Sequence, residues 1–297
     1  MKKYILTFLF FISLGNVFAQ CVNQCNSNVG YYSNNDPATI GYDNMGSSYH
    51  STYAAEPNGY IVWGERMHRN GTSNILSPQT INSTNYTALT GDVLLVGLGS
   101  HYVYDVQLIV LTSTGLFAGG VVGAVLSSSI KNTTAFSKLT INGKADGPPT
   151  GISPDSVKMM FVTHRSIILT TCGGRVFVLS QDANVRGAAG SGSATSWSQV
   201  KQSTTAPLTN VIAVRGNSGF AFALKADSTI WTWGDGTLLG NSTGATNYNY
   251  ARQMTKPSGL TGIKMIQTTE YYNYWWGSPD KSYYILGTNG KVYSLGC

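Results

Sequence analysis

A short phrase recurs five times along the chain: an apolar run, a turn residue, a second apolar run and a closing Trp-Gly or a degenerate form of it. The five copies are Tyr53–Gly64, Leu108–Gly120, Ile167–Ser180, Phe222–Gly234 and Tyr283–Gly296. Their turn residues lie roughly 55 to 60 residues apart, a period typical of repeat architectures. The repeat therefore constrains the architecture before any single residue indicates a chemistry.

A second apolar run follows a proline in each period and precedes the next copy of the phrase. These runs are Asp92–Gly97, Ser156–Phe161, Asn210–Gly216 and Gly262–Gln267. Because almost every position is apolar, they are expected to be strands buried on both faces. The phrase itself predicts a β-hairpin, with a two-residue turn at Cys172-Gly173 or Gly173-Gly174 in the third copy and at Asp227-Ser228 in the fourth. One period thus supplies three or four antiparallel strands, the content of one blade of a β-propeller.

The composition supports an all-β fold. The chain has 34 glycines and 18 tyrosines but only three glutamates, Glu56, Glu65 and Glu270, so strand and turn formers outnumber helix formers. Only 11% of the residues are charged and the formal net charge is +6, with no cluster of Lys and Arg. This distribution lacks the electrostatic footprint of a nucleic-acid-binding protein.

Residues 1–19 have the features of a secretory signal peptide. Lys2 and Lys3 precede the apolar run Ile5–Leu14, which is too short to span a bilayer, and cleavage is expected near Ala19. No later segment is long and apolar enough for a membrane span, so we expect a secreted or cell-surface protein. Residues 20–50 are expected to be a polar lead-in, and residues 51–297 the repeats.

Four cysteines in an exported protein suggest disulfides. Cys21 and Cys25 are close enough in sequence to pair with each other. Cys172 lies within a predicted hairpin, where a free buried thiol is the simpler expectation. None of these positions has an active-site signature.

The fourth copy carries a family resemblance. Gly219–Gly240 (GFAFALKADSTIWTWGDGTLLG), followed by Pro257 and Leu260, resembles the repeat of the regulator of chromosome condensation family, G-x-x-H-x-x-A-L-x-x-D-G-x-V-x-x-W-G. Phe220 stands where that family often has His, and Gly236 where it has Asn. The resemblance covers roughly residues 51–297 and implies a β-propeller, which in this family has seven blades. The chain holds four to five blades, so we expect an incomplete ring and further domains downstream.

Six residues that close copies of the repeated phrase are expected to anchor the repeat. They are Trp63, Gly64, Gly120, Trp233, Gly234 and Gly296. Trp233 is expected to pack against the adjoining blade, and Gly234 lets the chain turn sharply at the end of the strand. The first two copies reach the closing position one residue sooner after the turn than the last three do.

Catalytic motifs are weak. Gly240–Gly244 matches G-x-S-x-G, but no helix follows it, so we interpret it as a loop. The four histidines do not have the spacing of metal ligands; they are His50, His68, His101 and His164. Asp105, Asp146 and Asp182 could supply a catalytic pair of carboxylates, but no motif in their neighbouring sequence indicates such a pair. We therefore expect no catalytic residue, no metal and no cofactor.

An aromatic cluster precedes the last copy of the phrase. Its members are Tyr271, Tyr272, Tyr274, Trp275 and Trp276. The cluster breaks strand alternation and is expected to form a loop whose rings bind a protein or a glycan. The alternative is that Trp275 and Trp276 fill the interface between blades.

These observations favour an exported, non-enzymatic propeller scaffold that binds a protein or glycan ligand. A secreted inhibitor of an enzyme is one alternative, and a guanine-nucleotide exchange factor, as in the namesake of the family, is another that the signal peptide disfavours. Asp155–Val157 and Asp227–Thr229 are similar to the Asp-Ser/Thr-apolar sites that Bacteroidetes glycosylate after export. Together with the Asn/Ser/Tyr-rich composition, this suggests an origin in that group.

Overall fold

The protein is nearly all β in the computed structural model. The described residues are 45–48, 51–56, 59–69, 72–102, 105–120, 136–139, 147–189, 192–217, 219–237, 246–273 and 278–296. They form five antiparallel sheets, each built from strands that pair in the order in which they follow along the chain. We call these sheets blades one to five.

The first two blades each have four strands. Blade one consists of β1 (Met45–Ser48), β2 (Ser51–Glu56), β3 (Gly59–Arg69) and β4 (Thr72–Thr80). Blade two consists of β5 (Val93–Tyr102), β6 (Asp105–Thr112), β7 (Gly115–Gly120) and β8 (Ser137–Lys138). The first strand of blade one lies within residues 20–50, so this segment is not entirely the polar lead-in that the sequence suggests.

The remaining blades continue the same meander. Blade three consists of β9 (Val157–Val162), β10 (Ser166–Thr171), β11 (Val176–Ser180) and β12 (Ser198–Gln199), with a short 3-10 helix, η1 (Pro154–Ser156), before it. Blade four consists of β13 (Val211–Gly216), β14 (Phe220–Lys225), β15 (Ile230–Thr237) and β16 (Thr246–Gln253). Blade five consists of β17 (Ile263–Asn273), β18 (Ser278–Gly287) and β19 (Val292–Gly296).

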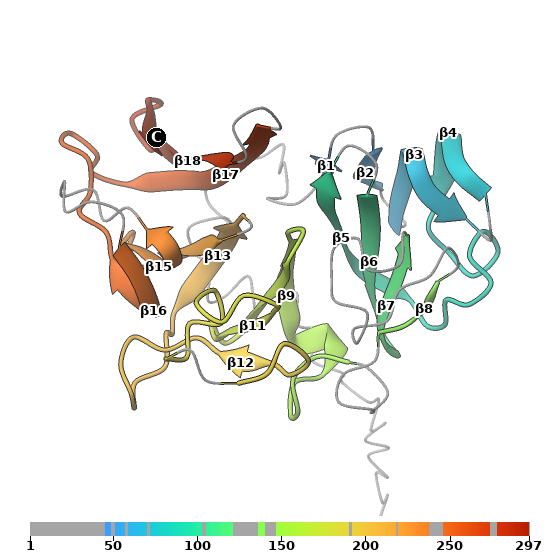
Figure 1. Ribbon diagram of the computed structural model, residues 1–297, viewed down its shortest axis with the longest axis horizontal. Helices are drawn as coiled ribbons and strands as arrows, with labels where there is room; N and C mark the ends of the chain where they lie inside the picture. Colours follow the sequence, from blue (N-terminus) through green and yellow to red (C-terminus); the bar gives the residue numbers. More distant parts are fainter. Residues whose placement is uncertain are drawn as a thin grey trace, which may run out of the picture.

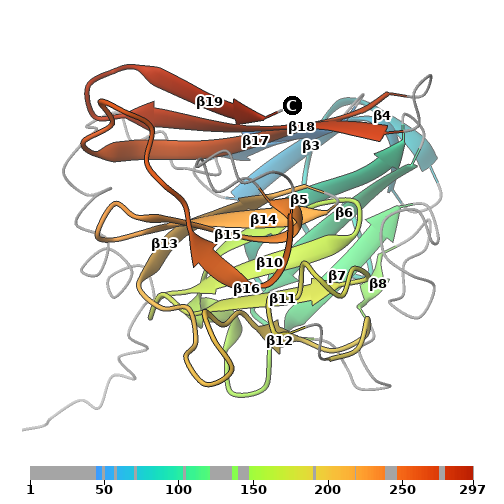
Figure 2. The ribbon, with the colours of Figure 1, turned by 60° about the vertical axis from the view of Figure 1, so that its left-hand side comes forward.

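The blades follow one another along an arc (Figure 1). The first strands of successive blades, β1, β5, β9, β13 and β17, lie side by side at its inner edge. Figure 2 shows β17, β18 and β19 together at one edge of the molecule. The arrangement is that of a β-propeller with five blades, which confirms the predicted fold class.

The hairpins between the second and third strands differ from the predicted two-residue turns in blades three and four, and blade five has the same form as these two. In blade three the amide of Gly174 donates to the carbonyl of Thr171 and the amide of Thr171 donates to that of Arg175, both at 2.9 Å. Blade four repeats both bonds around Ser228, and blade five repeats them around Gly290. These loops therefore have three residues, not two, and their third residue has a positive φ of 60° to 76°.

The extra loop residue explains the spacing of the repeats. In blade two, Thr112 pairs with Gly115, which leaves a two-residue loop at Ser113 and Thr114. In blade one, Glu56 pairs with Gly59 in the same way. Because the last three loops are one residue longer, their closing residue lies one position farther from the turn.

Two further features recur that the sequence does not reveal. The first strands of blades two to five each contain a β-bulge close to their start, at Leu94, Lys158, Ile212 and Lys264. In the same four blades, the first residue of the hairpin loop donates a backbone hydrogen bond to the residue before the first strand, as Cys172 does to Ser156 at 2.9 Å. The bond fixes the loop against the edge of its own blade.

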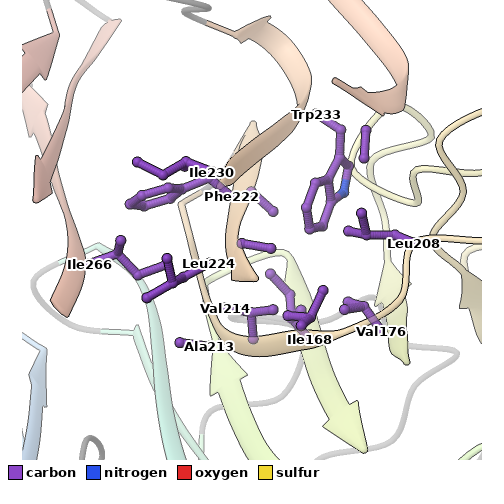
Figure 3. Packing of buried hydrophobic residues seen from close by; sticks show 14 of the residues in the cluster. Ile168, Val176, Leu208, Ala213, Val214, Phe222, Leu224, Ile230, Trp233 and Ile266 are labelled. Carbon is purple, nitrogen blue, oxygen red and sulfur yellow. The ribbon is translucent and has the colours of Figure 1, made fainter. Parts of the chain in front are cut away.

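The core lies between neighbouring blades. Its largest cluster joins blades three, four and five, and Figure 3 shows Ile168 and Val176 of blade three on one side of blade four and Ile266 of blade five on the other. Trp233 is fully buried in this cluster, whereas Trp63, at the equivalent position of blade one, is half-buried. Tyr283 of blade five is buried and bonds the hydroxyl of Thr232 in blade four at 2.8 Å.

The closing glycines occupy positions where a side chain does not fit. Gly64, Gly120 and Gly234 have φ of 127°, 129° and 114°, a region that side chains rarely adopt. A Cβ on Gly234 would lie 2.7 Å from the Cα of Phe220, closer than real contacts. Ser180 closes blade three, where its hydroxyl accepts a 2.7 Å hydrogen bond from Ser166.

Cys172 is buried and forms a disulfide. The expectation of a free buried thiol at this position is therefore wrong, because the buried sulfur is bonded to a second cysteine. The predicted pair Cys21 and Cys25 lies outside the described residues.

Candidate functional site

The meander gives the propeller two distinct faces. Each blade is antiparallel, so its first and third strands end on one face, and the loop between its second and third strands lies on the other. We call the first the hairpin face, because the connection between the first and second strands of each blade lies there. We call the second the turn face, because the short loop between the second and third strands lies there. The strand that precedes a connecting residue determines the face on which that residue lies.

The hairpin loops of the turn face are nearly uniform, although the connections between blades that start on this face differ in length. The hairpin loops have two residues in blades one and two and three residues in blades three to five. Such tight loops specify strand register and present little surface for recognition.

The hairpin face is uneven, because its inner strands differ in length. In register, Leu98 of β5, Val162 of β9, Gly216 of β13 and Thr268 of β17 occupy equivalent positions. β9 and β13 end there, whereas β5 continues for four residues to Tyr102 and β17 for five to Asn273. At 3.3 Å per residue these extensions amount to about 13 Å and about 17 Å.

The result is a pair of low turns flanked by two long hairpins. One low turn is Thr163–Arg165 of blade three, and the other begins at Asn217 of blade four. The long hairpins are β5–β6 of blade two and β17–β18 of blade five. Since blades three and four lie between blades two and five along the arc, the low turns lie between the long hairpins (Figure 1).

The low turns are fixed by the same arrangement of hydrogen bonds. The Thr163 hydroxyl accepts from the amides of Arg165 and Ser166 at 3.2 and 3.0 Å. The Asn217 side-chain oxygen accepts from the amides of Gly219 and Phe220, both at 3.2 Å. Each turn is thus closed by a polar side chain at its first position.

The aromatic cluster falls on one of the long hairpins. Tyr271 and Tyr272 belong to β17 and pair in register with Asp280 and Pro279 of β18, so the expectation of a loop at these two positions is wrong. Tyrosine has a high strand propensity, and the ladder with β18 outweighs the break in alternation that suggested a loop. Tyr274, Trp275 and Trp276 lie outside the described residues.

No group of three or more His, Cys, Asp or Glu among the described residues could hold a metal ion. Lys158, at the bulge of β9, is half-buried, and desolvation lowers its pKa to about 8. Arg165 is exposed on the low turn of blade three, a position that nothing in the sequence marks. The Gly240–Gly244 motif lies outside the described residues.

Among the residues that the structure describes, no helix has the length and apolar character required to cross a membrane.

The fold defines a β-propeller of the type found in the regulator of chromosome condensation family. The chain is similar to human WBSCR16, with 16% identity and a TM-score of 0.59, over 85% of this chain and 61% of that one. It is also similar to Saccharomyces cerevisiae Prp20, the yeast RCC1, solved bound to Kap60, with 15% identity and a TM-score of 0.54, over 85% of this chain and 55% of that one. No family model and no curated protein matches the sequence.

The chain thus spans between half and two thirds of the length of these structures. At such low identity the likeness shows the fold alone. A second structure of Prp20, described with its binding to Gsp1p and histones, matches with 13% identity and a TM-score of 0.53, over 85% of this chain and 57% of that one.

Proposed function

We propose that the protein is an exported, non-enzymatic propeller scaffold that recognises a protein or glycan ligand through its hairpin face, in a larger secreted or surface protein of a Bacteroidetes-like organism. The observation that carries the proposal is the difference between the two faces. Nearly uniform hairpin loops on the turn face maintain the register of every blade, whereas the hairpins between first and second strands on the other face differ in length. Binding residues concentrate on irregular connections that a regular scaffold holds in place.

Two further observations are consistent with this function. Among the described residues no group of three or more His, Cys, Asp or Glu could hold a metal ion, and the proposed recognition requires none. The charged and apolar features of residues 1–19 favour export, and a disulfide at Cys172 suits an oxidising compartment.

Binding is tested with two variants of blade five. Tyr271→Ala combined with Tyr272→Ala alters the long hairpin, and Tyr293→Ala alters an aromatic residue near the turn face of the same blade. The parent is screened against a glycan array and a panel of secreted proteins, and each hit is titrated with both variants. We expect at least tenfold weaker binding for the double variant and less than twofold change for Tyr293→Ala. Equal loss in both variants would contradict the proposal.

Export is tested separately. The full chain and a chain that begins at residue 20 are expressed in a Gram-negative host and the cells are fractionated. We expect processed protein outside the cytoplasm only for the full chain. Retention of both in the cytoplasm would overturn the assignment of residues 1–19.

A further inference from the structure

Cys172 lies on the turn face of blade three and forms a disulfide whose second cysteine lies outside the described residues. It is the first residue of the hairpin loop, and its amide donates a 2.9 Å hydrogen bond to the carbonyl of Ser156, the residue before β9. The loop therefore holds the sulfur at the start of the first strand of its blade. The chain has three other cysteines, so the partner is one of Cys21, Cys25 and Cys297.

Cys297 lies on the opposite face from this bond. It directly follows Gly296, the last residue of β19, and consecutive Cα atoms are about 3.8 Å apart. Gly296 pairs with Ser282, just as Ser180 pairs with Ser166 in blade three. Both pairs lie at the ends of their strands farthest from the hairpin loops. Gly296 is thus at the hairpin face, whereas Cys172 is at the turn face.

The distance between these two places is too large for a disulfide. Along β19 alone, Gly296 is about 13 Å from the end of the strand that meets the turn face. Blade four also lies between blade three and blade five (Figure 1). The Cα atoms of two bonded cysteines lie within about 7 Å of each other. The partner of Cys172 is therefore one of the two cysteines that precede β1.

The chain that carries Cys21 and Cys25 enters the fold on the correct face. At the hairpin face, Ser48 of β1 pairs with Ser51 of β2, so the other end of β1, at Met45, lies at the turn face. β1 contacts β5, and β5 contacts β9. Two steps from blade to blade thus lead from Met45 to the start of β9, beside which Cys172 is held.

The length of chain before β1 is sufficient to cover these two steps. Packed sheets lie about 10 Å apart, so the two steps amount to about 20 Å. Met45 comes 20 residues after Cys25. An extended chain spans about 3.3 Å per residue, which gives about 66 Å for this stretch and more for Cys21. Either cysteine can therefore reach Cys172 across the turn face.

We propose that Cys172 is bonded to Cys21 or Cys25, and that this disulfide fixes the chain before β1 to the turn face of blade three. The predicted Cys21–Cys25 pair is then excluded, because each cysteine forms one disulfide. The two thiols lose two protons and two electrons to the disulfide of a thiol oxidoreductase in an oxidising compartment, which becomes a dithiol. The bond lies on the face opposite the long hairpins, so the inference goes beyond the proposed binding function and does not depend on it.

The bond should also stabilise the propeller. It closes a loop of about 150 residues that contains blades one and two. A loop of this length strongly restricts the unfolded chain, and the folded chain already brings its two ends to the same face. Loss of the bond should therefore lower the resistance to urea.

Peptide mapping identifies the partner directly. The purified full chain is oxidised in a glutathione buffer, its free thiols are blocked with N-ethylmaleimide, and it is digested with trypsin without reduction. Cys172 then lies in Ser166–Arg175, Cys297 lies in Val292–Cys297, and the other two cysteines share a peptide that ends at Arg66. We expect mass spectrometry to find Ser166–Arg175 linked to the peptide that ends at Arg66. A link to Val292–Cys297, a link between two copies of Ser166–Arg175, or a blocked Cys172 would overturn the inference.

Urea unfolding of the oxidised protein tests the effect on the fold. Cys172→Ser should lower the midpoint by about 1 M, and Cys21→Ser combined with Cys25→Ser should lower it equally. Cys297→Ser is the matched control and should keep the midpoint of the parent. Dithiothreitol should lower the parent to the level of Cys172→Ser and leave that variant unchanged. A parental midpoint for the double variant, or a loss in Cys297→Ser, would contradict the proposed bond.

Discussion

The indole nitrogen of Trp233 donates a 2.7 Å hydrogen bond to the backbone carbonyl of Val185. Trp233 lies on the third strand of blade four, and Val185 lies in the connection that follows the third strand of blade three. The bond is fully buried, so one side chain both fills the space between two blades and satisfies a carbonyl there. Thr232 and Tyr283 connect blades four and five in a similar way, through hydroxyls 2.8 Å apart.

Two substitutions of Trp233 should lower the free energy of unfolding by different amounts. Trp233→Phe leaves the carbonyl of Val185 without its donor, which should cost about 1 to 3 kcal/mol. Trp233→Ala also opens a cavity and should cost about 3 to 5 kcal/mol. Urea unfolding measures both free energies, and an unchanged midpoint for Trp233→Ala would contradict the packing described above.

Gly234→Ala should destabilise the protein because φ is 114° and the new Cβ would meet the backbone of Gly219 and Phe220. We expect a loss of about 2 kcal/mol or more in the free energy of unfolding. Gly173→Ala is the control, since the closest atom to its Cβ is the Thr171 hydroxyl at 3.9 Å. Similar losses for the two variants would refute the role of backbone strain at Gly234.

Ser228→Gly should stabilise the protein. Ser228 is the third residue of its hairpin loop and has a φ of 60°, where glycine stands in the loops of blades three and five. Removing the side chain relieves a left-handed conformation that costs about 1 kcal/mol, less the entropy that glycine adds to the unfolded chain. A net rise of about 0.5 kcal/mol in thermal or urea unfolding is expected, whereas Ser228→Val should lower stability.

Lys158→Met should stabilise the protein most at neutral pH. Burial lowers the pKa of Lys158 to about 8, so between that pH and the unfolded value near 10.4 the unfolded chain binds more protons and stability rises with pH. The gain from Lys158→Met is therefore full below pH 8 and declines toward pH 10. Urea unfolding from pH 7 to pH 10 measures the gain, with Lys264→Met at the equivalent but exposed bulge as the matched substitution; a gain from Lys158→Met that does not change with pH would contradict the effect of burial.

The second and third strands of each blade, and the first strands of blades two to five, could be predicted because their apolar runs and turn residues are local signals. The fourth strands could not. β8 and β12 have two residues each, and their ladders arise from contact with a strand that is already in place. The bulges at Lys158 and Lys264 have no sequence signature, since they depend on how the first strand meets the hairpin loop.

The candidate site was predicted only in part. The aromatic residues of blade five were predicted to form a binding loop, but Tyr271 and Tyr272 extend a strand. The low turns went unnoticed because Thr163 and Asn217 close them with ordinary residues. Their position between two longer hairpins depends on the alignment of four blades, which periodicity alone does not give.

The loops of the turn face determine register at the opposite end of each blade from the long hairpins. We therefore expect that residues beyond Leu98 on β5 and beyond Thr268 on β17 can be exchanged without a shift in the pairing of the strands below them. Grafted sequences of other lengths at these two ends should still yield a folded chain. The binding specificity of these two hairpins could then be changed while the propeller fold is retained.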